Sequence, residues 1–177
     1  MPETSASSQP DREVVITRTF NAPRSLVWDA WTDPKMFVHW WGPFPTVNPM
    51  CEMDLRPGGA FRWVMMSPNG QEYPLTGVYK EIVKPERIVY THSLAENPPA
   101  WHDQLNKLRG TPKGSMVPDG VVTVLFADEN GKTQLTITTL FDSAATADAF
   151  RGMQMVQGWG MSLDRLERVV SKSTSDV

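Results

Sequence analysis

Apolar and polar side chains alternate along most of this chain, and the alternation predicts a protein built mainly from β-strands. Val14, Ile16 and Phe20 alternate with polar or smaller residues in a first β-branched segment that begins near Glu13, as expected for a strand with one buried face. Six further segments are bounded by turn residues and lie near 47–56, 60–66, 72–83, 87–93, 120–128 and 132–141. Because most connections between them are short, we expect antiparallel neighbours.

Helical spacing occurs after the first strand and again near the C-terminus. Apolar residues from Leu26 to Trp31 form one stripe after Pro23, and Asp33-Pro34 ends that helix and begins a short second one that reaches Trp41. A long helix is expected from about 144 to 172, with an apolar face of Val156, Trp159, Leu163, Leu166 and Val170. The predicted order is therefore a strand, two short helices, six strands and one long helix.

Residues 94–119 separate two strands and show little periodicity. The segment carries four prolines and two glycines, so we expect a long loop insertion, either a lid over a site or a surface excursion. The polar residues 1–12 are expected to form a disordered tail, because they have too little apolar content to offset the entropy of ordering. We expect a single domain over 13–172 and a short C-terminal tail over 173–177.

Composition and charge exclude several classes of protein. The chain has 177 residues, with 17 Lys and Arg against 20 Asp and Glu, and a nucleic-acid partner is not expected without clustered positive charge. One cysteine, Cys51, and three histidines form no disulfide and no recognisable zinc spacing, so we expect neither a metal nor a cofactor. No segment approaches the roughly 20 apolar residues of a membrane span. With a polar start instead of a signal peptide, a cytoplasmic protein is expected.

Several longer motifs occur in the order found in one known family. They are "FNAPRSLVWDAWTDP", "HWWGP", "CEMDLRPGGAFRWVM", "GVYKEIVKPERIVYTHS" and "GWGMSLDRLERVV". Over about 13–170 the chain resembles the bacterial homologues of the activator of the ninety-kilodalton heat-shock protein ATPase, within the START-like or SRPBCC superfamily. The resemblance implies an α+β helix-grip (START-like, Bet v-like) fold, in which a curved antiparallel sheet wraps around the long C-terminal helix. It also implies an elongated apolar cavity, which superfamily members use for lipids, sterols, polyketides or plant hormones.

The turn Pro57-Gly58-Gly59 joins two of the predicted strands and suggests a register. If it pairs Leu55 with Phe61, then Met53 lies opposite Trp63 and Asp54 lies opposite Arg62. The face toward the helix then carries Cys51, Met53, Leu55, Phe61, Trp63 and Met65. On the other face, Arg62 is expected to be a solvated cross-strand partner of Asp54.

Polar groups on the inward face are few. Alternation in "RIVYTHS" places Tyr90 and His92 on the same side as Ile88, so they would offer one hydroxyl and one imidazole to a cavity if Ile88 points inward. Tyr79 is a weaker candidate, because its neighbours Val78 and Ile82 compete for that face. A solid core and a structural role for His92 remain alternatives. The candidate ligand-binding residues are Trp41, Met53, Phe61, Trp63, Met65, Tyr79, Tyr90, His92, Met155, Trp159 and Ser162.

Three functions are compatible with these residues. The first is a small-molecule-binding protein that holds a hydrophobic or amphipathic ligand between sheet and helix. The second is an interaction module that docks on a heat-shock ATPase, as the eukaryotic namesake does. The third is a cyclase-like or hydratase-like enzyme for an aromatic or polyketide-like substrate, with Tyr90 and His92 moving protons. No known catalytic motif occurs, so we assign no catalytic residue and favour binding. Tryptophans expected on the surface of the helical pair also suggest a homodimer.

Overall fold

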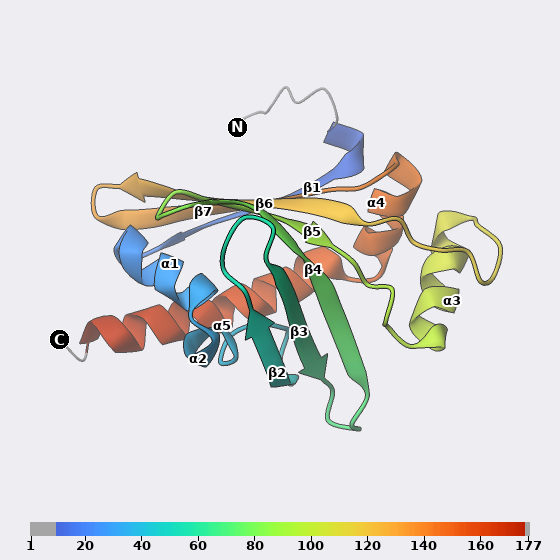
Figure 1. The fold of residues 1–177 in the computed structure, drawn as a ribbon, viewed down its shortest axis with the longest axis horizontal. Helices are drawn as coiled ribbons and strands as arrows, with labels where there is room; N and C mark the ends of the chain where they lie inside the picture. The colour runs from blue at the N-terminus through green and yellow to red at the C-terminus, as the bar shows by residue number, and fades with distance from the viewer. Residues whose placement is uncertain (1–9, 176–177) are drawn as a thin grey trace.

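A curved antiparallel sheet wraps around one long helix in the computed structural model, which describes residues 10–175 (Figure 1). The strands are β1 (Glu13–Phe20), β2 (Val47–Met53), β3 (Ala60–Met66), β4 (Glu72–Val83), β5 (Arg87–His92), β6 (Gly120–Glu129) and β7 (Lys132–Leu140). Their order in the sheet is β1-β7-β6-β5-β4-β3-β2. The helices are α1 (Arg24–Thr32), α2 (Pro34–Phe37), α3 (Pro99–Arg109), α4 (Ala144–Gly152) and α5 (Met155–Ser175), after the 3-10 turn η1 (Pro10–Arg12). The predicted α+β helix-grip fold is confirmed.

The β2–β3 hairpin keeps the predicted faces but not the predicted register. Met53 pairs with Phe61 and Cys51 pairs with Trp63, a shift of two residues, because the chain from Asp54 to Ala60 forms a wider turn closed by the Asp54 N–H donating to the Ala60 carbonyl at 3.0 Å. A side chain on Gly59 would lie 1.9 Å from the Asp54 carbonyl oxygen, so this turn requires glycine there. A shift by an even number leaves the side chains of the paired residues on their expected faces. Leu55, which was expected to face the helix, lies in the turn instead and is 37% exposed.

Arg62 lies on the outer face of β3, as predicted, but its predicted ion pair with Asp54 is wrong. Its guanidinium pairs with Glu96 at 2.8 Å, while Asp54 pairs with Arg56 at 2.9 Å. The altered register places Glu52 across from Arg62. Arg62 therefore connects β3 to the chain segment that leads into α3.

The predicted C-terminal helix is two helices. It breaks between α4 and α5 at Met153 and Gln154, and Gln154 has a φ of 67°, in the left-handed region that ends a helix. The glycines Gly152, Gly158 and Gly160 lower helix propensity in this stretch. Helix α5 also continues to Ser175, so most of the predicted C-terminal tail is helical. Residues 1–9 and 176–177, the rest of the two predicted tails, lie outside the described residues.

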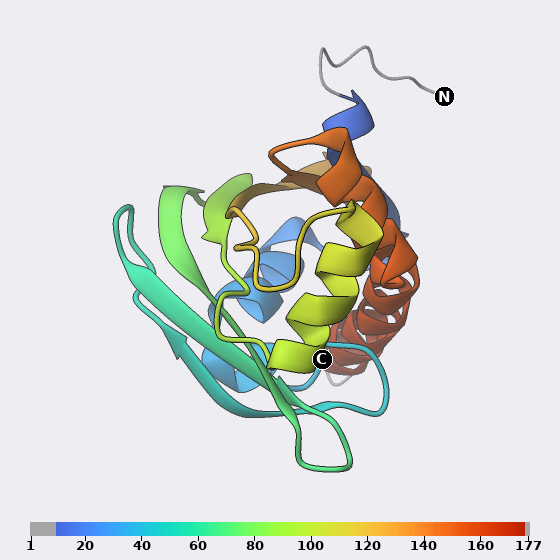
Figure 2. The same ribbon diagram turned by 90° about the vertical axis from the view of Figure 1, so that its right-hand side faces the viewer.

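The 94–119 insertion is not simply a loop, because it contains α3. Pro99 occupies the first turn and Gly110, with a φ of 76°, ends the helix, which is the usual placement of the two residues. Leu105 is fully buried against a cluster that includes Val14, Phe141 and Phe150. The carboxamide oxygen of buried Asn106 accepts hydrogen bonds from Arg109 and Thr111. Figure 2 shows α3 lying across one end of the sheet, beside α4.

The opposite end of the molecule, beneath α1 and α2, is filled with aromatic rings. Trp28, Trp31 and Trp40 are at most 2% exposed, and the Trp40 indole N–H donates to the Ala30 carbonyl at 2.8 Å. The expectation that the helical pair exposes its tryptophans is therefore wrong, because this pair packs its apolar stripe on the sheet and α5. The homodimer stays a prediction that has lost this support.

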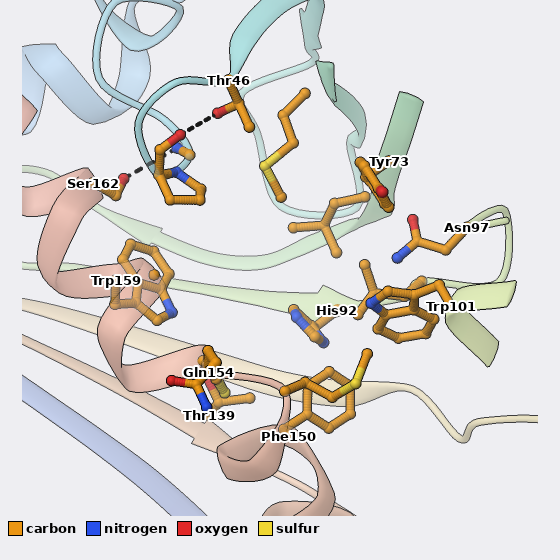
Figure 3. Close-up of a pocket in the computed structure, with 18 of the residues that line it drawn as sticks. Thr46, Tyr73, His92, Asn97, Trp101, Thr139, Phe150, Gln154, Trp159 and Ser162 are labelled. Atoms are coloured by element: carbon orange, nitrogen blue, oxygen red, sulfur yellow. Dashed lines mark hydrogen bonds between the residues drawn. The ribbon is translucent and has the colours of Figure 1, made fainter. Parts of the chain in front are cut away.

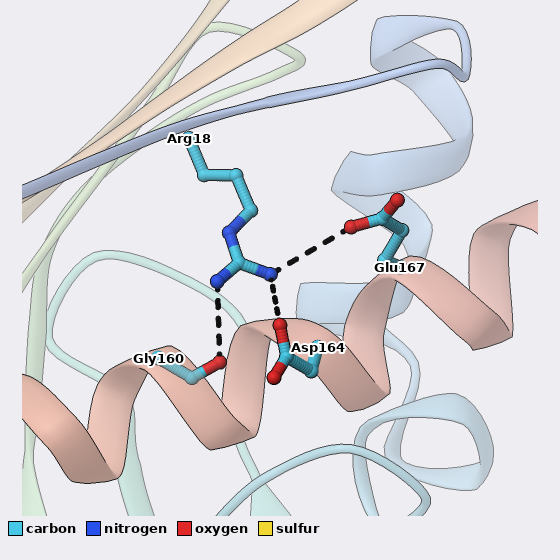
Figure 4. A network of polar contacts seen from close by, with 4 residues as sticks. All are labelled: Arg18, Gly160, Asp164 and Glu167. Carbon is cyan, nitrogen blue, oxygen red and sulfur yellow. Dashed lines mark hydrogen bonds and ion pairs between the residues drawn. The ribbon is translucent and has the colours of Figure 1, made fainter.

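Arg18 attaches the edge strand β1 to α5 (Figure 4). Its guanidinium lies 2.7 Å from an Asp164 carboxylate oxygen and 3.7 Å from a Glu167 oxygen, and it also donates to the Gly160 carbonyl at 3.3 Å. Alternation along β1 points the side chain toward the helix. The contact joins the edge strand to the middle of α5.

Candidate ligand-binding site

A cavity of about 450 Å³ lies between the sheet, α3 and the junction of α4 and α5 (Figure 3). This volume is within the usual range of small-molecule sites. It is lined by Trp41, Gly42, Pro43, Thr46, Met65, Tyr73, Leu75, His92, Leu94, Asn97, Trp101, Gln104, Val122, Thr139, Phe150, Gly152, Met153, Gln154, Met155, Gly158, Trp159 and Ser162. The break between the two C-terminal helices forms part of its wall.

Helix α5 holds the loop that forms another wall of the cavity. The Ser162 hydroxyl donates to the Trp40 carbonyl at 2.9 Å and accepts from the Gly42 N–H at 3.1 Å. The Arg165 guanidinium donates to the Gly42 carbonyl at 2.8 Å. A side chain on Gly42 would lie 2.7 Å from the Thr46 hydroxyl, and its φ is 95°, so this loop needs glycine at the point where it faces the cavity.

Part of the predicted ligand-binding set lines the cavity. Trp41, Met65, His92, Met155, Trp159 and Ser162 all do so. They come from the loop after α2, from β3, from β5 and from α5, and the sheet and helix bring them together as the helix-grip fold implies. The Ser162 hydroxyl is already engaged with backbone groups, so its contribution is to shape the wall.

The other predicted site residues pack into the aromatic core beside the cavity. Met53, Phe61, Trp63, Tyr79 and Tyr90 are absent from its lining. Phe61 and Trp63 stack with centroids 4.2 Å apart, and Trp63 meets Tyr90 edge to face at 5.2 Å. This part of the sheet face is solid core.

Tyr79 points inward together with Ile82, although strict alternation would place them on opposite faces. Tyr79 pairs with Tyr90, while Glu81 pairs with Val89, so the intervening Lys80 forms a β-bulge that reverses the alternation. Tyr79 is 1% exposed and Val78 is 40% exposed. The bulge therefore lets both Tyr79 and Ile82 face the core, while Val78 faces outward.

Burial alters the ionisation of the polar groups on this face. It raises the pKa values of the Tyr79 and Tyr90 phenols well above their usual range, and both hydroxyls lack a hydrogen-bond partner. Burial lowers the pKa of His92 to about 4, although the Asp119 carboxylate acts in the opposite direction. His92 is therefore neutral at physiological pH. Tyr90 lies outside the cavity, so the two side chains do not form an acid–base pair facing a common guest.

Several lining residues were missed in the sequence. Asn97, Trp101 and Gln104 belong to the insertion that was expected to be a loop. Thr139 comes from β7, Phe150 from α4 and Gln154 from the junction of α4 and α5. A helical signal was present, because Trp101, Leu105 and Leu108 recur at steps of four and three between Pro99 and Gly110. Asn97 is 7% exposed, and its carboxamide oxygen has no hydrogen-bond partner.

The arrangement is suited to binding an apolar body. Within residues 10–175 no cluster of three His, Cys, Asp or Glu side chains could hold a metal ion. Over the same range, no helix is both long and apolar enough to cross a bilayer. What the cavity offers is aromatic and thioether surface with a few neutral hydrogen-bonding groups, and this chemistry binds without requiring a reaction.

The curved antiparallel sheet and the long helix that it grips define a START-like protein of the helix-grip class. Residues 21–171 match the family described as "Activator of Hsp90 ATPase homolog 1-like protein", and the chain belongs to this family. No curated protein matches the chain.

Solved bacterial structures share the fold at low sequence identity. A protein from Nitrosomonas europaea has a TM-score of 0.77 at 23% identity, covering 94% of this chain and 99% of that one. One from Mycobacterium smegmatis has a TM-score of 0.75 at 20% identity, covering 96% and 97%. One from Arthrobacter aurescens has a TM-score of 0.74 at 20% identity, covering 92% and 87%. At these identities the likeness establishes the fold alone.

Proposed function

We propose that the protein binds a hydrophobic or amphipathic small molecule in the cavity under α3. The observation that carries the proposal is the cavity of about 450 Å³, whose lining includes Trp41, Trp101, Phe150 and Trp159. Bulky side chains fill the rest of the interior, so a guest has a defined place. A cytoplasmic location, expected from the sequence, is part of the same proposal.

The energetics favour such a site without any catalytic group. Each Å² of apolar ligand surface removed from water contributes about 25 cal/mol. A guest that buries roughly 300 Å² would gain about 7.5 kcal/mol before the costs of immobilisation, which offset a substantial part of it. Methionines such as Met65, Met153 and Met155 line the cavity and can adapt to guests of different shape.

Two glycines of α5 provide a matched test. Gly158 lines the cavity and Gly160 does not, and a side chain added at either position meets no atom within 4 Å. Gly158→Leu should therefore fill the cavity, while Gly160→Leu places the same side chain outside it. Both changes remove a helix-interior glycine, so neither should destabilise α5 through helix propensity.

Native mass spectrometry of protein purified from its own host is the measurement. Wild type and Gly160→Leu should carry a small organic molecule that Gly158→Leu lacks. Equal loading of all three proteins would place the ligand elsewhere. If no protein carries a ligand and none binds an apolar probe in solution, the proposal fails.

A second candidate function is docking on a heat-shock ATPase, which the family description favours. It requires a surface and not the cavity, so Gly158→Leu should leave it intact. The test is the ATPase rate of the host's ninety-kilodalton heat-shock protein during titration with this protein. An unchanged rate would eliminate this candidate, and a change that Gly158→Leu preserves would support it.

A further inference from the structure

Within residues 10–175 the sheet ends in two edge strands, β1 and β2, and only β2 is blunted. Pro49 lies inside β2, and the pairing of β2 with β3 is irregular between Val47 and Met50. Proline and irregular pairing are common means by which proteins keep a sheet edge from pairing with another strand. β1 instead pairs with β7 in unbroken register over all eight of its residues and contains neither proline nor glycine. β1 is therefore the edge that can accept another strand.

The hydrogen-bonding pattern with β7 decides which backbone groups of β1 face this edge. The Arg12 carbonyl accepts from the Phe141 N–H at 2.9 Å. Hydrogen-bonded and non-hydrogen-bonded pairs alternate along an antiparallel ladder, so every second residue from Glu13 onwards directs its N–H and C=O away from β7. These residues are Glu13, Val15, Thr17 and Thr19.

One of these four residues is already engaged. The Arg151 guanidinium of α4 donates to the Glu13 carbonyl at 2.6 Å. In the part of the chain that the structure describes, no hydrogen bond reaches the outward backbone groups of Val15, Thr17 or Thr19. Their side chains are uncharged and β-branched, and all three residues are exposed. The middle of β1 therefore offers a neutral, exposed strand with backbone groups that a second strand can bond.

A second copy of β1 matches this edge. A two-fold axis at Thr17 places Thr17 opposite Thr17 of the second copy and Val15 opposite Thr19 of the second copy. Facing residues with outward backbone groups can exchange both of their hydrogen bonds. This is the only antiparallel register in which Val15, Thr17 and Thr19 pair among themselves. The edge is thus complementary to itself, with no charged side chain in any of these pairs.

The two neighbouring registers of the same kind meet obstacles in the protein. An axis at Ile16 would pair Thr19 with Glu13, whose carbonyl is already occupied. An axis at Arg18 would place two guanidinium groups directly opposite each other, which is unfavourable. With the axis at Thr17, Arg18 lies opposite Ile16 of the second copy and keeps its ion pair with Asp164 of its own chain at 2.7 Å (Figure 4).

We propose that two copies of this chain pair antiparallel along β1, with the two-fold axis at Thr17, so that their sheets continue into one another. The inference is independent of ligand binding. Main-chain hydrogen bonds supply the affinity in strand pairing of this kind, and Thr17 facing its counterpart adds a favourable cross-strand pair. Although the chain has a net charge of -3, the residues at the centre of the contact carry no charge that would oppose association.

Charged residues at the two-fold axis test both the contact and its register. Because Thr17 would face its own counterpart, Thr17→Lys and Thr17→Glu each bring like charges together, while an equimolar mixture of the two variants brings opposite charges together. Sedimentation equilibrium of the wild type should show a mass that approaches twice that of the chain as the concentration rises. Each variant alone should raise the dissociation constant of the dimer at least about 5-fold. The mixture should associate at least as tightly as the wild type.

Thr123 provides the matched control. It is a threonine of β6, separated from β1 by β7 and paired with Thr138. Thr123→Lys and Thr123→Glu make the same changes away from the edge and should keep the wild-type dimer. A second measurement needs no variant: in NMR hydrogen exchange of the wild type, the N–H groups of Val15, Thr17 and Thr19 should exchange more slowly at high than at low protein concentration.

The results decide the inference as follows. A dimer that is lost in both Thr17 variants and regained on mixing supports it, because that pattern requires a residue that faces its own counterpart. Wild-type protein that stays monomeric at its highest soluble concentration overturns it. A dimer that dissociates in the Thr123 variants but not in the Thr17 variants would form through the face of the sheet, which also overturns it. If the mixture of Thr17 variants stays monomeric, the axis does not lie at Thr17 and the proposed pairing is wrong.

Discussion

His92 shows how one residue can connect the cavity to the stability of the whole protein. Its ring approaches Phe141 and Phe150 edge-on, with centroids 6.3 and 6.0 Å away. Burial lowers its pKa from 6.5 to about 4. Between these two pH values the unfolded chain binds a proton that the folded protein does not. The contribution of neutral, buried His92 to the free energy of unfolding is therefore fully present above pH 6.5, and it is lost as the pH falls toward 4.

Urea unfolding measured between these pH values should show this loss. Relative to a His92→Gln variant, wild type should lose on the order of 1 to 3 kcal/mol of unfolding free energy as the pH falls from 6.5 to 4. Carboxylates that titrate in the same range act on both proteins and cancel in the comparison. Parallel curves for the two proteins would mean that burial does not hold His92 neutral.

At the scale of elements, the strands were predictable and the helices only in part. β1, β3 and β4 have the expected bounds, because alternation and turn residues are local signals. The position of the break was not predictable, because a left-handed glutamine such as Gln154 has no strong local signature and a single nearby glycine, Gly152, only weakens a helix. Helix α3 was missed because four prolines in the insertion outweighed the short stripe of Trp101, Leu105 and Leu108.

The position of α3 depends on Leu105, and this dependence can be tested. Leu105 is fully buried against α4 and β1, whereas Leu108 on the same helix is 48% exposed. Leu105→Ala should cost about 2 to 4 kcal/mol, because it leaves a cavity under the helix, and should loosen α3 before the rest of the fold. Leu108→Ala should cost less than about 1 kcal/mol.

Hydrogen exchange followed by mass spectrometry separates local loosening of α3 from a loss of stability of the whole fold. In Leu105→Ala, amides of 99–109 should exchange faster than in wild type, while those of β6 and β7 keep their protection. Affinity for an apolar probe that the wild-type protein binds should fall as well, since α3 supplies Trp101 and Gln104 to the cavity. Unchanged exchange in α3 would show that other contacts hold this helix.

The whole molecule has one filled end and one hollow end. Beneath α1 and α2 the rings of Trp31, Phe37, Trp40 and Trp63 lie 4.5 to 6.3 Å apart, while the cavity occupies the end covered by α3. Alternation in the sequence predicted that Phe61 and Trp63 point inward, but Leu55 and Val156, expected on the inward faces, are exposed. The sequence could not predict which inward side chains meet other side chains and which face empty space, because that depends on where α3 and the α4–α5 junction lie.

This division predicts where a bound ligand changes the dynamics of the protein. At short labelling times, amides exchange through local openings. An apolar ligand at saturating concentration should therefore slow exchange in 99–109 and around 152–158, two segments that line the cavity. Exchange in α1 should stay unchanged at those times, because Trp28 and Trp31 already pack in the filled end. Gly158→Leu should show no ligand effect in any segment. Protection centred on α1 and α2 instead would place the ligand on the outer surface of the helical pair, and the cavity would then lose its role.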